Sequence, residues 1–278
     1  MRCARLYAIC RTIDDIADLP VTADARSLSK TRLGELLTAL HRRDTCDPVV
    51  AEANRLLLTD DYAWSALERL AATALADVNS VRIDNDNELY AYAEGVAGTV
   101  GLMMVGMLGA RDGPETRKAA HALGVAMQFT NIARDVLEDA QHDRLYLPRS
   151  WLDSGVTPAA IATGNPQARA SAWNAVQRLL EHAEVSYVAG WKGLPDLPSR
   201  SRLAIAVASH VYRRIGRRIL ARGPRRFWLG RYRVGTGGKL LASFHGLSLF
   251  LRSERGIPKE IEARKPESFP DATRNRER

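Results

Sequence analysis

The chain has 278 residues, 46% of them hydrophobic and 26% charged, which provides enough apolar material for a sizeable core. No apolar run approaches the roughly 18 to 20 residues of a membrane span, so the sequence predicts no transmembrane helix. It shows no secretory signal, and its three cysteines have no metal-ligand spacing. We therefore expect reduced thiols and a cytoplasmic location.

The net charge of +8 is unevenly distributed. Residues 200–278 carry 20 Lys and Arg against 6 Asp and Glu, whereas residues 1–199 carry 20 against 26. A basic C-terminal third favours an anionic partner, which is nucleic acid, an anionic membrane surface or a diphosphate substrate. No nucleic-acid-binding module is recognisable, so we expect no nucleic acid partner. Peripheral contact with a membrane and a merely solvated basic face both stay open.

Apolar residues at helical spacing predict an all-α, single-domain fold without strands. We expect the first helix over residues 1–16, stopped at Leu19-Pro20 because proline removes a backbone donor. The charged, aperiodic residues 253–278 predict a disordered tail behind a domain of residues 1–252. The other helices are expected at 25–43, 48–58, 61–78, 84–109, 114–139, a short segment within 151–163, 165–191, 197–222 and an apolar segment ending near 251.

Polar residues form one stripe along the first expected helix. Tyr7, Arg11, Asp14 and Asp18 recur at steps of four, three and four, so they share one face. The neighbouring faces are apolar, which indicates a helix that is largely surrounded by others. We therefore expect the stripe to line a cavity.

A second polar stripe occupies the helix expected at 114–139. Its two aspartates lie four residues apart, one helical turn, as Asp14 and Asp18 do in the first stripe. Such a pair is either a hydrated acidic face or a binding position for a hard divalent cation, and the second copy favours the cation. Magnesium prefers one or two carboxylates plus phosphate oxygens, so we expect a diphosphate ligand. The residues in line are Gln128, Asn131, Asp135 and Asp139, and the loop behind them holds Arg144 and Tyr146.

The helix expected at 84–109 contains five glycines, each of which costs about 1 kcal/mol relative to alanine in a helix interior. Such a series indicates either close helix packing or a helix wall left bare for a ligand. In the second case, apolar side chains beside the wall would form a flexible tunnel for a hydrocarbon. These side chains are Val96, Val100, Met103, Met104 and Met107.

The sequence resembles a known family in two stretches, RTIDDIAD and NIARDVLEDAQHDRLYLP. They are similar to the two signatures of the trans-isoprenyl diphosphate synthases that join substrates head to head, the family of phytoene and squalene synthases. The similarity includes Tyr-x-x-x-Arg before the first motif, Gln-x-x-Asn before the second and Arg-x-Tyr-Leu-Pro after it. Weaker similarity in ELYAYAEGVAGTVG, VYRRI and RFWLGRYRV extends it over nearly the whole chain, and the pattern is most like bacterial phytoene synthases.

The resemblance implies an isoprenoid-synthase bundle around an apolar cavity, and a prenyltransferase that uses magnesium or, alternatively, manganese. It implies condensation of two geranylgeranyl diphosphates to phytoene through a cyclopropyl diphosphate. NADPH, which squalene formation needs, is not expected because the sequence has no dinucleotide fingerprint. The metal ligands implied are Asp14, Asp18, Asp135 and Asp139, which are also catalytic together with Tyr92 and Tyr146. The substrate-binding residues implied are Tyr7, Arg11, Gln128, Asn131, Arg134, Arg144, Tyr212 and Arg231, and Arg233 is a further candidate in the same segment as Arg231.

Members of the family carry a few tens of residues before the first acidic helix, including a Ser-Phe pair in a flap over the diphosphate. Here thirteen residues precede Asp14. We therefore expect the 278-residue form to be weakly active or unstable, because water destroys a carbocation in an open site.

Three alternative functions stay open. The same fold could make squalene or presqualene diphosphate from farnesyl diphosphate, because the length of the tunnel decides the substrate. A non-catalytic scaffold is the second alternative, although this chain keeps all four aspartates. A terpene cyclase is the third, and the paired acidic motifs with the RLYLP loop argue against it. The sequence does not indicate the oligomeric state.

Overall fold

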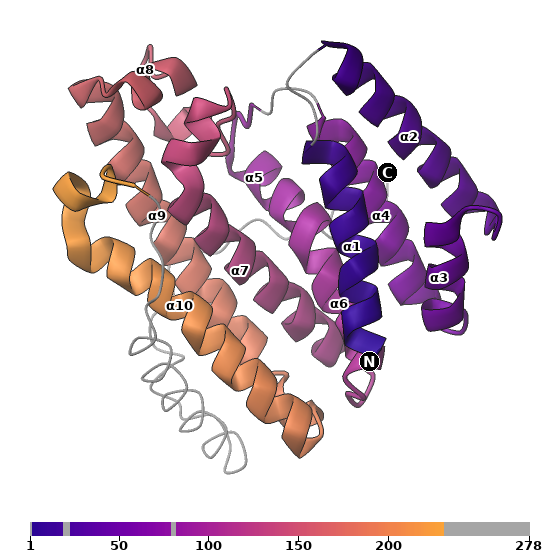
Figure 1. The fold of residues 1–278 in the computed structure, drawn as a ribbon. Helices are drawn as coiled ribbons and strands as arrows, with labels where there is room; N and C mark the ends of the chain where they lie inside the picture. The colour runs from indigo at the N-terminus through magenta and orange to yellow at the C-terminus, as the bar shows by residue number, and fades with distance from the viewer. Residues whose placement is uncertain (1, 19–22, 79–81, 231–278) are drawn as a thin grey trace, which may run out of the picture.

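The computed structural model of the protein describes residues 2–18, 23–78 and 82–230, and Figure 1 shows a bundle of helices. No strand occurs in these ranges, only one isolated bridge between Arg82 and Leu145, so the all-α expectation is confirmed. The helices are α1 (Arg2–Asp18), α2 (Ala23–Arg42), α3 (Pro48–Leu57), α4 (Asp61–Asp77), α5 (Asp86–Ala93), α6 (Thr99–Met107), α7 (Pro114–Gln141), α8 (Pro158–Thr163), α9 (Pro166–Trp191) and α10 (Ser199–Phe227). A π-helical turn, η1 (Glu94–Gly98), joins α5 to α6, and 3-10 turns occur at η2 (Arg149–Trp151) and η3 (Leu194–Asp196).

Side-chain caps fix several helix starts. Asp47 accepts hydrogen bonds from the first backbone N–H groups of α3, and Asp60 accepts one from Ala63 at the start of α4. The break expected at Gly223-Pro224 is present, because Gly223 has a φ of 70° inside α10. The apolar helix expected near 251 and the tail lie outside the described residues.

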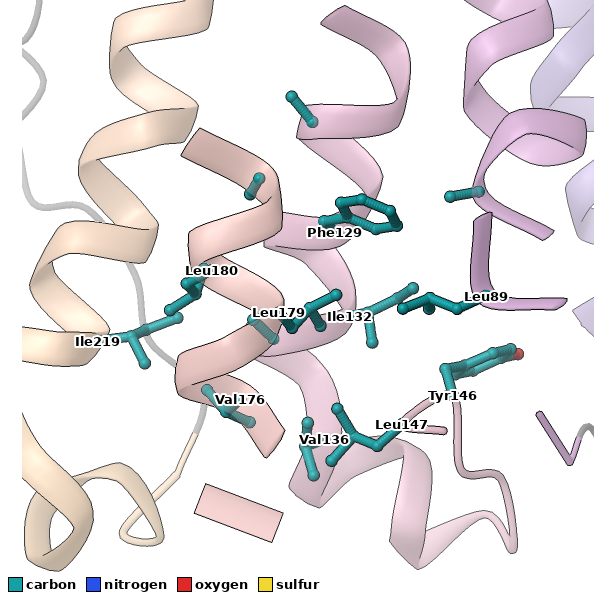
Figure 2. Close-up of a cluster of buried hydrophobic side chains, with 14 of the residues drawn as sticks. Leu89, Phe129, Ile132, Val136, Tyr146, Leu147, Val176, Leu179, Leu180 and Ile219 are labelled. Atoms are coloured by element: carbon teal, nitrogen blue, oxygen red, sulfur yellow. The ribbon is translucent and has the colours of Figure 1, made fainter. Parts of the chain in front are cut away.

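Two separate clusters of buried side chains hold the bundle together. The N-terminal cluster is formed by α1 to α4 with Met103 of α6. The C-terminal cluster is formed by α5 and α7 to α10 around Phe129, as Figure 2 shows in part. Helix α1 packs on α2, α3, α4 and α6, and α6 in turn packs on α7. The segment from η1 to α6 therefore runs along the boundary between the two clusters.

The glycines of this boundary segment serve close helix packing. A Cβ atom at Gly95 would lie 2.2 Å from Oγ1 of Thr73, and one at Gly101 would lie 2.2 Å from the carbonyl oxygen of Ala120. Of the two alternatives drawn from the sequence, close packing against α4 and α7 is thus the one observed. The tunnel expectation is wrong for Met103, which is completely buried in the N-terminal cluster. The partly buried side chains that pack against the same cluster are Val96, Val100, Met104 and Met107.

Candidate active site

Acidic residues gather where helices end. The C-terminal ends of α1, α4 and α7 all lie toward the top of Figure 1. None of these helices has a basic residue in its last turn, whereas Asp77 ends α4 and Asp139 lies in the last turn of α7. A helix C-terminus carries partial negative charge, and acidic side chains add to it. This end of the bundle therefore attracts cations.

Asp135 and Asp139 lie one turn apart on α7, as expected. The guanidinium of Arg134 donates from Nε to Oδ1 of Asp135 over 2.8 Å. Burial, with the charge of Asp135 added, raises the pKa of Asp139 to about 7, although Arg144 acts in the opposite direction. Ionised Asp139 thus carries negative charge that its neighbours compensate only in part, which suits a bound cation.

Tyr92 and Tyr146 are brought together by a residue that sequence reasoning missed, Asp77. The hydroxyl of Tyr92 donates to Oδ2 of Asp77 over 3.0 Å, and that of Tyr146 approaches the same oxygen at 3.3 Å. The two rings stack with centroids 4.8 Å apart. Burial, followed by the charge of Asp77, raises the pKa of both tyrosines. One signal could have pointed to Asp77, because an acid at the C-terminal end of a helix opposes the usual preference.

The loop behind α7 holds Tyr146 through a fixed backbone turn. Asp143 has a φ of 57°, in the left-handed region that non-glycine residues rarely adopt. Arg82 binds this residue twice, donating to its carbonyl oxygen over 2.8 Å and to its carboxylate over 2.9 Å. Figure 2 shows Tyr146 at the edge of the C-terminal cluster, with its hydroxyl pointing away from the aliphatic side chains.

Two amide side chains, Gln128 and Asn131, lie on the same face of α7 as the aspartates, on the N-terminal side of them. Nδ2 of Asn131 donates to Oε1 of Gln128 over 3.4 Å. Oδ1 of Asn131 is buried, and no atom of the described residues hydrogen-bonds to it. An unsatisfied buried acceptor costs about 1–3 kcal/mol, so this oxygen fits a ligand that supplies a donor or a positive charge. The pKa of Arg134 is raised, chiefly by its hydrogen bond to Asp135. Tyr212 on α10 lies close enough to Arg134 to add to this rise.

The stripe on α1 is placed differently from the expectation. Tyr7 is 68% exposed, and Arg11 and Asp14 are exposed as well. Among the described helices, α2, α3, α4 and α6 cover α1 on its apolar side. The stripe is exposed, so the interpretation of a surrounded helix is corrected. Arg11 pairs with Asp15 over 2.9 Å.

Some of the expected site lies outside the described part of the structure. The structure does not describe the side chain of Asp18, and it does not describe any part of Arg231 or Arg233. Within the described ranges, no three His, Cys, Asp or Glu side chains converge into a complete metal site. No described helix is both long and apolar enough to cross a membrane.

Comparison with known proteins places this geometry in a family. The family model described as squalene/phytoene synthase matches residues 2–237. The chain belongs to the squalene/phytoene synthase family. It is 36% identical to the 15-cis-phytoene synthase of Enterobacter agglomerans, with 92% of this chain and 90% of that protein covered. It is 37% identical to the phytoene synthase of Pseudescherichia vulneris, with 84% and 78% covered.

Solved structures of the squalene/phytoene synthase family share the fold. A dehydrosqualene synthase crystallised with a ligand matches with a TM-score of 0.72 and 23% identity, over 91% of this chain and 87% of that one. Squalene synthase HpnC from Alicyclobacillus acidocaldarius matches with a TM-score of 0.67 and 21% identity, over 83% and 84%. The family consists of prenyltransferases, so the chain is an enzyme of this class.

Proposed function

We propose that this prenyltransferase is a phytoene synthase, which condenses two geranylgeranyl diphosphates head to head through a cyclopropyl diphosphate. The observation that carries the proposal is the name shared by its curated relatives, since four bacterial proteins at 34–37% identity over most of the chain are phytoene synthases. Their identities exceed those of the squalene and dehydrosqualene synthase structures. Farnesyl diphosphate, as the substrate of a squalene-type reaction, is the second candidate.

A divalent cation, magnesium or alternatively manganese, fits the acidic end of the bundle. The partly compensated charge of Asp139 and the unsatisfied Oδ1 of Asn131, one turn before Asp135, both favour a positive ligand there. When bound, magnesium would stabilise the charge that develops on the departing diphosphate. Magnesium prefers one or two carboxylates together with phosphate oxygens, so the diphosphate would complete its coordination. We propose Asp14, Asp18, Asp135 and Asp139 as the ligands.

The remaining site residues act on the substrate itself. Arg134 and Arg144 lie beside the acids of α7 and bring positive charge for the diphosphate oxygens. The stacked rings of Tyr92 and Tyr146 present aromatic faces, which attract an allylic cation. Tyr212 lies beside Arg134 and adds a third ring to this side of the site.

A product assay tests the proposal. Purified protein with magnesium is expected to convert geranylgeranyl diphosphate to phytoene without NADPH, and to lose this activity when EDTA removes the metal. Farnesyl diphosphate serves as the competing substrate in a parallel reaction, with and without NADPH. Squalene or presqualene diphosphate from farnesyl diphosphate, with no phytoene from the longer substrate, would replace the proposed function by the second candidate.

We propose further that the C-terminal end of α10 docks on an anionic membrane, where an apolar product can leave. Arg222, Arg225 and Arg226 are exposed there beside Leu229, which is 83% exposed. Each basic residue near an anionic surface contributes about 1 kcal/mol, so the surface favours anionic lipid.

The docking is tested by sedimentation with vesicles of phosphatidylserine and phosphatidylcholine. The double charge reversal Arg225→Glu with Arg226→Glu is expected to weaken binding about tenfold or more, and added salt is expected to weaken the wild type. Arg26→Glu with Lys30→Glu on the exposed surface of α2 provides the matched control. Equal loss in both double variants, or binding that ignores salt, would remove the membrane contact from the proposal.

A further inference from the structure

We propose that Asp77 is a positioning residue of the reaction, which holds Tyr92 and Tyr146 so that their stacked rings face the carbocation. The inference rests on the proposed function of the site. Three elements distant in sequence meet here, since Asp77 ends α4, Tyr92 belongs to α5, and Tyr146 follows α7. Their meeting point is a single carboxylate oxygen, Oδ2, which lies 3.0 Å from one hydroxyl and 3.3 Å from the other.

The hydrogen bonds determine what the tyrosines offer to a substrate. A phenol has one proton, and both hydroxyls are directed at Asp77, while the hydroxyl of Tyr146 also interacts with that of Tyr92. What each tyrosine presents elsewhere is therefore its ring face and its remaining oxygen lone pair. Donation to a carboxylate increases the negative charge on the phenol, so Asp77 strengthens the attraction of both rings for a cation. The stacking at 4.8 Å with an angle of 25° between the planes keeps the two rings acting as a pair.

Asp77 also differs from the acids that we propose as metal ligands. Its charge is one of those that raise the pKa of Asp139, so the two carboxylates are near neighbours. Asp77 faces two phenolic hydroxyls, with both of them near Oδ2 and that of Tyr146 also 3.4 Å from Oδ1. The acidic end of the bundle thus contains carboxylates for the cation and one carboxylate for the aromatic pair.

The test compares Asp77→Asn, Tyr92→Phe and the double variant in steady-state kinetics with geranylgeranyl diphosphate and magnesium. Asp77→Asn keeps the shape of the side chain and removes its charge. We expect kcat to fall about 10- to 100-fold, the loss typical when a partner that orients an active-site group is removed, with KM within about twofold of wild type. Released cyclopropyl diphosphate or prenyl alcohol is expected to rise, because the cation is less well stabilised. Asp77→Glu, which retains the charge, is expected to restore part of kcat.

A matched control exists at Asp196, away from the acidic helix ends. Its carboxylate also accepts a side-chain hydroxyl, that of Thr116 over 2.8 Å, and pairs with Arg111 over 2.9 Å. Asp196→Asn therefore removes an equivalent structural link, and we expect kcat within about twofold of wild type. An equal loss of kcat in Asp77→Asn and Asp196→Asn would assign Asp77 a structural role and overturn the proposal.

Two further readouts separate this inference from the proposed function. If Asp77 acts through Tyr92, the double variant loses much less than the product of the two single losses, whereas fully multiplicative losses overturn the inference. Tyrosine ionisation, followed by ultraviolet difference spectra in the absence of substrate, needs no activity. Removing the charge of Asp77 is expected to let two tyrosines ionise at lower pH than in wild type, and Asp196→Asn is expected not to. An unchanged titration in Asp77→Asn and Asp77→Glu would overturn the inference even if the wild type made no phytoene.

Discussion

Replacement of Asp139 by asparagine is expected to abolish product formation while making the metal-free protein more stable. The loss of activity follows from its proposed role as a cation ligand, and we expect a decrease on the order of 10²- to 10³-fold in kcat. The gain in stability follows from burial and from the charge of Asp135, which together raise the pKa of Asp139 to about 7. A group whose pKa is higher in the folded state than in the unfolded chain opposes folding once it is ionised.

The pH dependence has a definite sign. The ordinary pKa of Asp139 is 3.8, so the stabilisation that its protonation provides is complete below about pH 4 and is lost as pH rises through about 7. At higher pH, Asp139→Asn is expected to exceed metal-free wild type by about 4 kcal/mol in the free energy of unfolding. Thermal melts in EDTA on both sides of pH 7 measure this difference.

Glu138→Gln is the control for this prediction. Glu138 lies next to Asp139 on α7 but is exposed, so its removal subtracts one charge without opening the buried face. We expect its activity and its melting temperature to remain close to wild type. A metal-free Asp139→Asn variant that melted below the wild type above pH 7 would show that burial and the charge of Asp135 do not destabilise the ionised carboxylate.

Gly101→Ala is expected to destabilise the protein by about 1–3 kcal/mol, because a side chain there meets backbone that cannot rotate away. Its Cβ atom would lie 2.2 Å from the carbonyl oxygen of Ala120 and 2.8 Å from the carbonyl carbon. The contact would push α6 away from α7, so activity is expected to fall together with stability. Urea unfolding monitored by circular dichroism gives the free energy.

Gly34→Ala provides the matched comparison, since Gly34 lies inside α2 and a Cβ atom there meets nothing within 4 Å. That substitution is expected to stabilise the protein by about 0.5–1 kcal/mol, because alanine favours a helix interior over glycine. Stabilisation of similar size in both variants would show that helix propensity, and not the approach of α6 to α7, determines the result.

The sequence predicted the helices well because their signals are local. Asp60 caps α4, Pro114 begins α7, and Gly223-Pro224 interrupts α10 at the expected places. The π-helical turn at Glu94–Gly98 was not predictable in this way, since it lies within one apolar, glycine-rich segment that reads as a continuous helix. The glycines of this segment could serve close helix packing or leave a helix wall bare for a ligand. Only the neighbouring residues on α4 and α7, which are distant in sequence, distinguish the two alternatives.

Sequence analysis predicted the site residues that share one face of a helix. It missed a residue that reaches the site from a different helix. Asp135 and Asp139 follow from spacing on α7, whereas Asp77 joins Tyr92 and Tyr146 through contacts that no periodicity reveals. The exposure of Tyr7, Arg11 and Asp14 was misjudged for a related reason. Apolar neighbours along a helix show that one side is covered, but they do not show whether the polar side faces another helix or solvent.

The boundary between the two clusters of buried side chains divides the proposed site residues as well. Asp14 and Asp77 belong to helices of the N-terminal cluster, whereas Asp135, Asp139 and Tyr146 belong to the C-terminal part. Each cluster has its own apolar interior, so each is a candidate unit of local unfolding. A substrate held by groups from both units binds only when the two are folded and in register. We therefore expect catalytic competence to be a cooperative property of the whole bundle, and substrate binding to stabilise the junction between its halves.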